Sequence, residues 1–251
     1  MSMSGRAPRS SVGRRRTLWR APGGVGVDRT IGTGVDVARA AVVIAHHPAL
    51  RAVKRGIDIV GSSALIVLLL PLALIVALAI VLDSRGPVLF LQRRVGRGGV
   101  EFALIKFRTM VRDGERALAA HVGADEGLRR EWTQARKLRN DPRITRLGRF
   151  LRRFSIDELP QLLNVFIGNM SLVGPRPVPR DELAYFGDRA AQIVEVRPGL
   201  TGLWAVSGRS EISYRERVEL EHRYVVEWSL RMDALILLKT IPAVVRGHGA
   251  Y

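Results

Sequence analysis

The chain has 251 residues and a formal net charge of +17 at pH 7, from 40 Lys and Arg against 23 Asp and Glu. This excess predicts an anionic partner: nucleic acid, lipid headgroups or a phosphorylated substrate. Cysteine is absent, which excludes disulfides and thiolate chemistry, and the five scattered histidines make no zinc-type spacing with another ligand.

Residues 1–50 are predicted to form a disordered, basic tail. They are rich in Arg, Gly, Ser and Ala with almost no aromatic residues, a composition that cannot bury enough apolar surface to fold. No apolar segment with a small-residue cleavage site follows the arginines, so the tail does not resemble a secretory signal. The short apolar patch at 38–45 is too brief to span a bilayer.

Residues 51–84 are predicted to form a helical hairpin in a membrane. From Ile59 to Leu82 the chain is almost wholly apolar. A helix of that length covers about 36 Å, against a bilayer core of about 30 Å. The alternative is a buried helix of a soluble core, but such helices rarely stay uncharged over that length.

Pro71 stands in the middle of this apolar segment, and basic residues flank both of its ends. Arg51, Lys54 and Arg55 precede it and Arg85 follows it, so the positive-inside rule gives no clear orientation for a crossing. A helix broken at Pro71 that enters one leaflet and returns would leave both basic ends on the cytoplasmic side. We favour this re-entrant, monotopic arrangement over a single kinked span.

Residues 85–251 are predicted to form a small cytoplasmic catalytic domain of the α+β class, mainly helical. Two short strands are expected within residues 84–97 and 102–110, joined by a glycine-containing turn. Lys106 and Arg108 lie two residues apart, so on a strand they would project from one face, as two cations gripping a diphosphate would. A solvated basic strand edge explains the same pair equally well.

Helices are predicted for most of the remaining domain. Residues 111–140 have the charge pattern of one or two surface helices, 146–153 that of a basic helix, and 159–167 that of an apolar helix ending at Gly168. Two amphipathic helices are expected within 215–246. The second could lie in the interface plane of a membrane or pack on the core of its own domain.

Two adjacent carboxylates, Asp157 and Glu158, lie in the basic segment before the apolar helix. The spacing of Ser155 and Glu158 fits a capping box, but Pro160 would then fall inside the helix, where its missing N–H removes a hydrogen bond. A helix start nearer the two acids removes that conflict. The helix dipole would then keep both carboxylates ionised, as a nucleophile or a metal ligand must be.

A carboxylate pair, nearby arginines and a membrane segment indicate chemistry on phosphate esters at a bilayer surface. Such chemistry needs cations to neutralise phosphoryl oxygens, a metal to bridge them and an anionic nucleophile in line with the leaving group. Asp157 and Glu158 are neighbours and project in different directions, so one can attack phosphorus while the other binds a metal. The residues allow this division of roles without forcing it.

Four longer motifs occur in one order along the chain. Together they resemble the bacterial sugar transferase family, the monotopic polyprenyl-phosphate phosphoglycosyltransferases, over about residues 54–251. Any one motif alone is a weak signal, whereas four in order are specific. The motifs are KFRTM at 106–110, SIDELPQLLNV at 155–165, MSLVGPRP at 170–177 and PGLTGLW at 198–204.

This resemblance implies transfer of sugar 1-phosphate from a UDP-sugar to undecaprenyl phosphate, with release of UMP, at the cytoplasmic face of the inner membrane. The step initiates exopolysaccharide, capsule or O-antigen biosynthesis. The resemblance further implies that Asp157 forms a covalent aspartyl-phosphosugar intermediate and that Glu158 helps to hold Mg²⁺. By position, Lys106, Arg152 and Arg176 match family residues that contact phosphate.

Two other classes of function remain open at this point. A basic, membrane-attached scaffold for polysaccharide assembly would explain the charge and the apolar segment without any chemistry. Nucleic-acid binding rests on the charge alone, because no basic motif interleaved with aromatic residues appears. We therefore predict lipid and sugar-nucleotide partners and no nucleic-acid partner.

Overall fold

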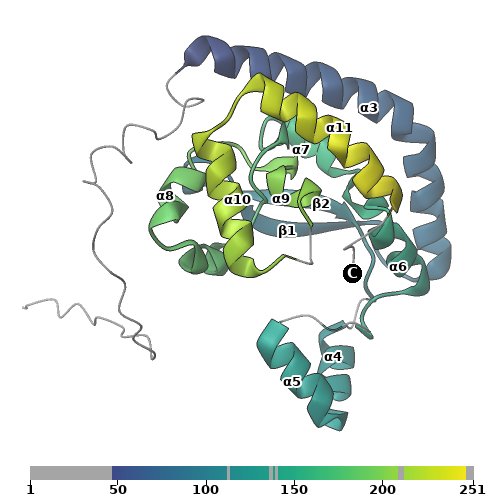
Figure 1. Cartoon of the computed structure of the whole chain (residues 1–251). Helices are drawn as coiled ribbons and strands as arrows, with labels where there is room; N and C mark the ends of the chain where they lie inside the picture. The colour runs from purple at the N-terminus through teal and green to yellow at the C-terminus, as the bar shows by residue number, and fades with distance from the viewer. Residues whose placement is uncertain (1–46, 112–113, 136–137, 139–140, 209–211, 247–251) are drawn as a thin grey trace, which may run out of the picture.

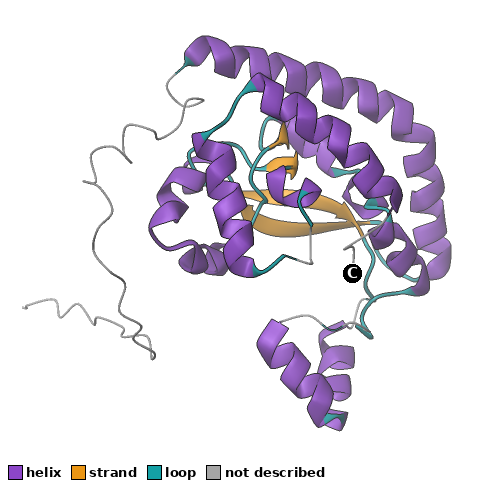
Figure 2. Ribbon diagram, in the orientation of Figure 1, coloured by secondary structure: helices purple, strands orange, loops and turns teal. Residues whose placement is uncertain are grey.

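A computed structural model gives the arrangement of residues 47–111, 114–135, 138, 141–208 and 212–246 (Figure 1). In this described part the chain is mainly helical and contains two small two-stranded sheets, in agreement with the predicted α+β class. Figure 2 shows the sheets in the middle of the domain with helices around them.

The predicted tail lies largely outside the described residues. Its last residues, 48–50, are not part of a tail but form the first turn of helix α3 (Pro48–Asp83). Pro48 occupies the start of that helix, where the missing N–H has no helical partner to lose and the fixed φ suits the helix. The predicted boundary at residue 51 is therefore too late by one turn.

Helix α3 has 36 residues and is long and apolar enough to cross a membrane. Figure 1 shows that it bends within its length and follows two sides of the domain. Pro71 lies inside this helix, where a proline removes one hydrogen bond and forces a bend. The predicted break into two separate helices is wrong: the helix bends but continues, because hydrogen bonding resumes on both sides of one lost bond.

The N-terminal half of α3 is held against the domain by buried polar contacts. The Lys54 ammonium donates to the Asp233 carboxylate at 2.5 Å. One turn later, the Asp58 carboxylate accepts hydrogen bonds from the Ser171 hydroxyl and the Leu172 N–H, both at 2.9 Å. These contacts fix the first half of the apolar helix to the centre of the domain.

The C-terminal half of α3 packs on the same domain through apolar side chains. Val76 and Ile80 are buried in a cluster with Phe107 and Leu151. Other side chains of α3 stay exposed, so a large apolar surface faces away from the domain. The more exposed ones after Pro71 are Leu74, Ile75, Leu78, Val81 and Leu82.

An antiparallel hairpin follows α3, as predicted. It consists of β1 (Leu89–Val95) and β2 (Glu101–Phe107), with Gln92 opposite Leu104 in the register. The turn between the strands is the short helix η1 (Arg97–Gly99), and Gly98 has a φ of 70°, which favours glycine.

A second sheet was not predicted from the sequence. Strands β3 (Ser171–Val173) and β4 (Gly199–Thr201) pair in parallel and have only three residues each. A Cβ atom on Gly199 would collide with the backbone of Gly174, so both glycines allow a close approach. The pairing brings two of the sequence motifs side by side.

The predicted helices are confirmed, with small shifts of their ends. α4 (Gly114–Ala124) and α5 (Glu126–Ala135) form the surface pair, which projects from the rest of the domain in Figure 1. Gly168 ends α7 with a φ of 103°. The other helices are α6 (Arg146–Arg153), η2 (Ile156–Glu158), α7 (Gln161–Ile167), η3 (Arg180–Arg189), α8 (Ala190–Ile193), α9 (Leu203–Val206), α10 (Tyr214–Val226) and α11 (Leu230–Arg246).

Helix α11 packs on the core of its own domain, one of the two alternatives that its amphipathic pattern left open, and the placement at a membrane interface stays a prediction. Ile236 is buried in the main core, so one face packs on the domain. Leu238, Ile241 and Val245 are exposed on the same helix. An exposed apolar face of this kind suits the headgroup region of a membrane.

Candidate active site

The two carboxylates lie on a single turn of 3-10 helix, η2, between α6 and α7. Ser155 precedes this turn with a φ of 54°, and its side chain makes no N-cap hydrogen bond. Helix α7 begins only at Gln161, with Pro160 as its N-cap, where a missing N–H breaks no helical bond. The capping-box alternative is therefore wrong, and the acids occupy a tight turn of their own.

Glu158 forms an ion pair with Lys106 across the site. The Lys106 ammonium, on β2, lies 2.7 Å from the Glu158 carboxylate, and both side chains stay partly open to solution. A pair of this kind joins the end of the hairpin to the turn that carries both acids. An incoming phosphate group or metal ion can compete for either partner, because water already reaches them.

Asp157 is far more enclosed than its neighbour, with 7% of its surface exposed. Burial raises the pKa of the Asp157 carboxyl and the Glu158 charge raises it further, while Lys106 and Arg152 act in the opposite direction. The helix dipole was predicted to keep Asp157 ionised, but burial has the largest effect on the pKa of this carboxyl, and it favours the neutral form. The two cations are what favour the carboxylate form at this position.

Arg152 is oriented toward the dyad by a neighbouring motif. Its Nε donates to the Thr109 hydroxyl at 2.9 Å. Close to it, the Arg143 side chain donates three hydrogen bonds to the Asp141 carboxylate, at 2.9, 3.1 and 2.8 Å. The charges of Asp157, Asp141 and Glu158 all favour the charged form of the Arg152 guanidinium.

The side chains of Arg108 and Lys106 contact different parts of the protein. Nη2 of Arg108 donates to the Ser84 carbonyl at 2.5 Å and to the Ser84 hydroxyl at 3.0 Å, so the guanidinium closes the C-terminal end of α3. Binding of one diphosphate by Lys106 and Arg108 stays a prediction, but the two side chains contact different groups here, Glu158 and Ser84. Arg108 connects the end of α3 to the end of β2.

Arg176 lies in the loop after β3, in contact with residues from two other motif regions. Its guanidinium carbon lies 4.6 Å from the centre of the Trp204 ring. Its backbone N–H donates to both oxygens of Glu221 at 3.0 Å. These contacts join Arg176 to α9 and α10.

Three of these contacts were not predicted. They are the Arg152 hydrogen bond to Thr109, the contact of the Arg176 guanidinium with the Trp204 ring, and the hydrogen bond from the Arg176 N–H to Glu221. Thr109 and Trp204 lie inside two of the sequence motifs, and their place in a motif was the one sign in the sequence that they belong to the site. Glu221 gave no signal, because the periodicity of a charged helix does not reveal which acid becomes buried.

Glu221 is 1% exposed, and burial raises its pKa to about 7, opposed by the Arg176 N–H and by the charges of Arg217 and Arg176. A buried acid with a raised pKa contributes stability that is complete below about pH 4.5 and is lost as the pH rises through about 7.

The Glu221→Gln variant is therefore expected to lose less stability than the parent protein between pH 5 and pH 8, because Gln cannot ionise. The difference should reach about 3 kcal/mol at most, from about 1.4 kcal/mol per unit of pKa shift. Chemical unfolding of the purified protein at the two pH values measures it. Equal pH dependence in parent and variant would show that Glu221 keeps an ordinary pKa.

Asp157 and Glu158 have the chemistry to hold Mg²⁺ together with a substrate. Mg²⁺ prefers an octahedron of oxygen ligands and often uses one or two carboxylates with substrate phosphates and water. Among the described residues no cluster of three or more His, Cys, Asp or Glu could enclose a metal. Two adjacent carboxylates fit an ion that would take its other oxygen ligands from a substrate diphosphate and water.

An enclosed carboxylate between cations, close to a long apolar helix, is an arrangement that suits phosphoryl transfer. The chain belongs to the bacterial sugar transferase family, whose model matches residues 49–247. Both the predicted family and the prediction of a transferase enzyme are confirmed.

Named relatives cover most of this chain. It is 44% identical over 198 residues to exopolysaccharide production protein ExoY of Rhizobium meliloti (strain 1021), which is 79% of this chain and 88% of the relative. It is 41% identical over 206 residues to the UDP-glucose:undecaprenyl-phosphate glucose-1-phosphate transferase of Caulobacter vibrioides. The match covers 79% of this chain and 72% of that relative. The chain is 44% identical over 201 residues to the undecaprenyl-phosphate galactose phosphotransferase of Salmonella typhimurium, 80% of this chain but 42% of that relative.

Proposed function

We propose that this protein transfers sugar 1-phosphate from a UDP-sugar to undecaprenyl phosphate and releases UMP, as the initiating step of an exopolysaccharide, capsule or O-antigen pathway. The observation that carries the proposal is the enclosed Asp157 carboxylate with Lys106 and Arg152 acting on its charge. The names of two relatives support the lipid acceptor, and one of them includes UDP-glucose as the donor.

The reaction proceeds in two displacements at one phosphorus atom. An Asp157 oxygen attacks the β-phosphorus of the UDP-sugar, and the bond from that phosphorus to the bridging oxygen breaks, so UMP leaves. A phosphate oxygen of undecaprenyl phosphate then attacks the same phosphorus and releases the Asp157 carboxylate. The product is undecaprenyl diphosphate sugar, and the enzyme returns to its starting state.

Lys106 and Arg152 neutralise phosphoryl oxygens during both displacements. Their charges already act on Asp157 in the free enzyme, so little reorganisation is needed when a phosphate group arrives. Glu158 would hold Mg²⁺ with the donor diphosphate, and the ion would supply charge neutralisation to the leaving UMP. Exclusion of water by the burial of Asp157 protects the covalent intermediate from hydrolysis.

The metal role of Glu158 predicts a changed Mg²⁺ dependence in Glu158→Gln. The amide is nearly the same shape but a much weaker ligand, so the Mg²⁺ concentration for half-maximal activity should rise about tenfold or more. Titration of UMP release with MgCl₂ measures this, with Glu182→Gln, another partly buried glutamate in an ion pair, as the control. An unchanged titration in Glu158→Gln removes the metal role.

The membrane arrangement proposed here is re-entrant, with both ends of α3 at the cytoplasmic face. Support comes from the packing: Lys54 and Asp58 near one end, and Val76 and Ile80 near the other, all contact the same domain. A helix crossing the bilayer would place its ends about 30 Å apart on opposite sides, out of reach of one small domain.

This arrangement predicts that two single cysteines, Ala52→Cys and Arg85→Cys, react with an impermeant thiol reagent from the same side. The chain has no native cysteine, so each label reports one position. In intact cells both sites should be protected, and in inside-out vesicles both should react. Reaction of one site in intact cells and of the other only in inverted vesicles would refute the re-entrant arrangement.

The experiment that tests the function is UMP release by purified protein with undecaprenyl phosphate and UDP-glucose, UDP-galactose or the N-acetylated UDP-hexoses. At least one donor should give UMP in proportion to the lipid-linked product. Absence of UMP with every donor would favour the non-catalytic scaffold that the sequence left open.

A further inference from the structure

Three arginines from distant parts of the chain gather at one place in the domain. Arg94 lies on β1, Arg176 in the loop after β3 and Arg217 on α10. Burial lowers the pKa of the Arg94 guanidinium to about 10, and the charges of Arg176 and Arg217 lower it too, against the charges of Glu182 and Asp181. We refer to these three arginines as the Arg94 group.

Acidic side chains lie near the Arg94 group but occupy few of its nitrogens. Glu182 accepts from Nη2 of Arg217 at 2.7 Å. Glu221 accepts from the backbone N–H of Arg176, not from its guanidinium. In the part of the chain that the structure describes, no ion pair is recorded for Arg94 or Arg176. The acids therefore leave most of the guanidinium nitrogens without an acceptor.

The Arg94 group contains buried donors that have no acceptor. The Nε atoms of Arg94 and Arg217 are buried, and neither has a hydrogen-bond partner among the described residues. The same holds for the indole N–H of Trp204, whose ring lies against the Arg176 guanidinium. A buried donor without an acceptor costs free energy. A ligand with several acceptor oxygens, such as a phosphate ester, would supply the missing acceptors.

The Arg94 group lies along the same face of the hairpin as Lys106. Lys106 is opposite Phe90 in the register, and Arg94 follows Phe90 by four residues, so both side chains project to one side and about 13 Å of strand separates their levels. Nη2 of Arg94 donates to the Gln92 side chain at 2.7 Å, which directs the guanidinium back along the strand toward Lys106. A ligand that extends from the dyad along this face therefore meets Arg94.

The side of the domain on which the group lies favours the soluble substrate. The dyad follows α6, which packs on the C-terminal half of α3 through Leu151. Figure 1 shows α8 and α10 on the opposite side of the domain from that half of α3. The apolar chain of the lipid acceptor stays in the membrane with α3, because its exposure to water is unfavourable. The donor can extend away from the membrane helix, toward α10.

Two tyrosine rings beside Arg217 favour a nucleotide over a simple anion. The Arg217 guanidinium carbon lies 4.9 Å from the centre of the Tyr214 ring, and the Tyr185 ring lies 5.6 Å from the same ring, centre to centre. Tyr185 is 74% exposed. Nucleobases stack on exposed aromatic rings, so cations for a phosphate and a ring for a base occur together here.

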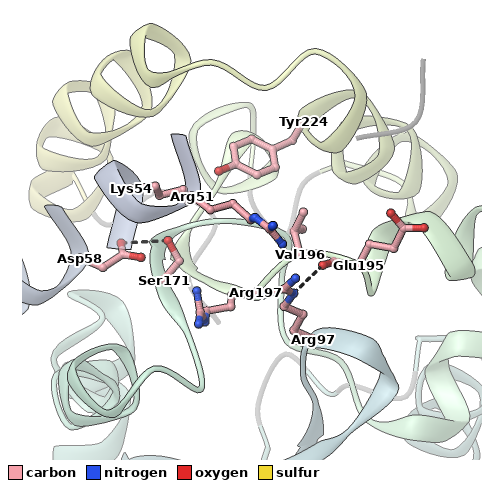
Figure 3. A pocket seen from close by; sticks show the side chains of 9 residues that line it. All are labelled: Arg51, Lys54, Asp58, Arg97, Ser171, Glu195, Val196, Arg197 and Tyr224. Atoms are coloured by element: carbon pink, nitrogen blue, oxygen red, sulfur yellow. Dashed lines mark hydrogen bonds between the residues drawn. The ribbon is translucent and has the colours of Figure 1, made fainter. Parts of the chain in front are cut away.

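Arginines also line a hollow of about 430 Å³ beside the N-terminal half of α3 (Figure 3), but that hollow lacks an open ring. Its aromatic residue, Tyr224, is 1% exposed. The Asp58 charge also favours the charged form of Arg197 there. Arg97 of this hollow therefore serves as a control for the loss of a cation away from the Arg94 group.

We propose that the Arg94 group binds the phosphate of the UMP half of the UDP-sugar, with the uracil beside Tyr185 and Tyr214. The phosphorus that Asp157 attacks then lies toward Lys106, and cations hold the leaving UMP when its bond to that phosphorus breaks. The inference rests on the proposed function for the identity of the donor, but UMP binding is measurable without turnover.

The test measures UMP binding to the full-length protein in detergent by isothermal titration calorimetry. The group variant carries Arg94→Gln and Arg217→Gln, and the matched control carries Arg93→Gln and Arg97→Gln. Arg93 adjoins Arg94 on the opposite face of β1, and its side chain is 86% exposed. The Kd for UMP should weaken at least about tenfold in the group variant and less than about twofold in the control. Equal weakening in the two, or no UMP binding by the parent protein, would contradict the proposal.

Other ligands separate the contribution of the base from that of the phosphate. Inorganic phosphate and uridine should each bind the parent protein at least about tenfold more weakly than UMP. Inorganic phosphate that binds as tightly as UMP would show a free-anion site and overturn the nucleotide assignment. Tyr185→Ala should weaken UMP binding about fivefold and leave phosphate binding unchanged. An unchanged Kd for UMP in this variant would overturn the placement of the uracil.

A single variant guards against a folding defect in the double variant. Arg217 holds an ion pair with Glu182, whereas none is recorded for Arg94 among the described residues, so Arg94→Gln alone should keep the parent Tm. Its Kd for UMP should still rise about fivefold, and Arg94→Lys should restore part of the loss. Equal UMP affinity in Arg94→Gln and the parent protein would contradict the proposal.

UMP release is scored separately from UMP binding. A protein that binds UMP through Arg94 but releases none from any donor keeps this site and loses the proposed function. A protein that releases UMP, but whose group variant binds UMP as tightly as the parent, keeps the proposed function and loses this site.

Discussion

Asp157→Asn is expected to lower the turnover of UMP release by at least about 10³-fold. An amide cannot form the acyl phosphate that the two-displacement reaction requires, although it has nearly the shape of the carboxylate. The fold should survive the change. Burial and the neighbouring Glu158 charge both raise the pKa of this carboxyl, so a neutral side chain suits the site at least as well.

Two measurements separate lost chemistry from lost structure. The Tm of Asp157→Asn should equal or exceed that of the parent protein, and the exposed control Asp188→Asn should keep full turnover. Turnover of Asp157→Asn within tenfold of the parent value would mean that another group attacks phosphorus.

Asp233→Ala is expected to cost about 3 kcal/mol of folding stability. The carboxylate lies 2.5 Å from the Lys54 ammonium, and 13% and 11% of the two side chains are exposed. Tyr224 also donates to it at 2.8 Å. Removal of one partner of a buried pair leaves the other charge uncompensated. For a domain of this size such a loss lowers Tm by about 6–12 °C, which thermal unfolding in detergent measures.

A double change gives the control for this ion pair. Lys54→Met with Asp233→Leu removes both charges and should recover much of the stability, because apolar pairs can replace buried ion pairs. The exposed pair Arg223–Glu227 gives a second comparison, since Glu227→Ala should cost less than about 1 kcal/mol. A cost for Asp233→Ala as small as that of Glu227→Ala would show that this pair does not anchor α3.

Elements with a strong local pattern were predictable from the sequence. The hairpin of β1 and β2 follows from alternating residues around a glycine turn, and α7 follows from an apolar run that ends at Gly168. The parallel pair β3 and β4 was not predictable in this way. Each strand has three residues, and their pairing depends on a close approach of glycines far apart in the chain.

Burial was the property that the sequence did not reveal at the site. Asp157 and Glu158 were both predicted to be ionised by a helix dipole, yet enclosure dominates the pKa of Asp157. The spacing of Lys106 and Arg108 predicted a shared ligand, whereas Arg108 closes the end of α3. In each case tertiary packing, not local spacing, decides the environment of the charge.

The same limit applies to Pro71. A proline predicts a disturbed helix, but whether the helix breaks or bends depends on what holds the residues on either side. Here buried contacts from Asp58 in one half and Ile80 in the other hold both halves against the domain. The helix therefore stays continuous and bends around the domain (Figure 1).

The most direct test of the central claim is isolation of the covalent intermediate. The purified protein is incubated with a labelled UDP-sugar and Mg²⁺ without undecaprenyl phosphate, quenched, digested and examined by mass spectrometry. We predict a sugar-phosphate adduct on the peptide that contains Asp157, absent from Asp157→Asn and discharged when undecaprenyl phosphate is added before the quench. Steady UMP release with no adduct on Asp157, or an adduct on another residue, would contradict the mechanism.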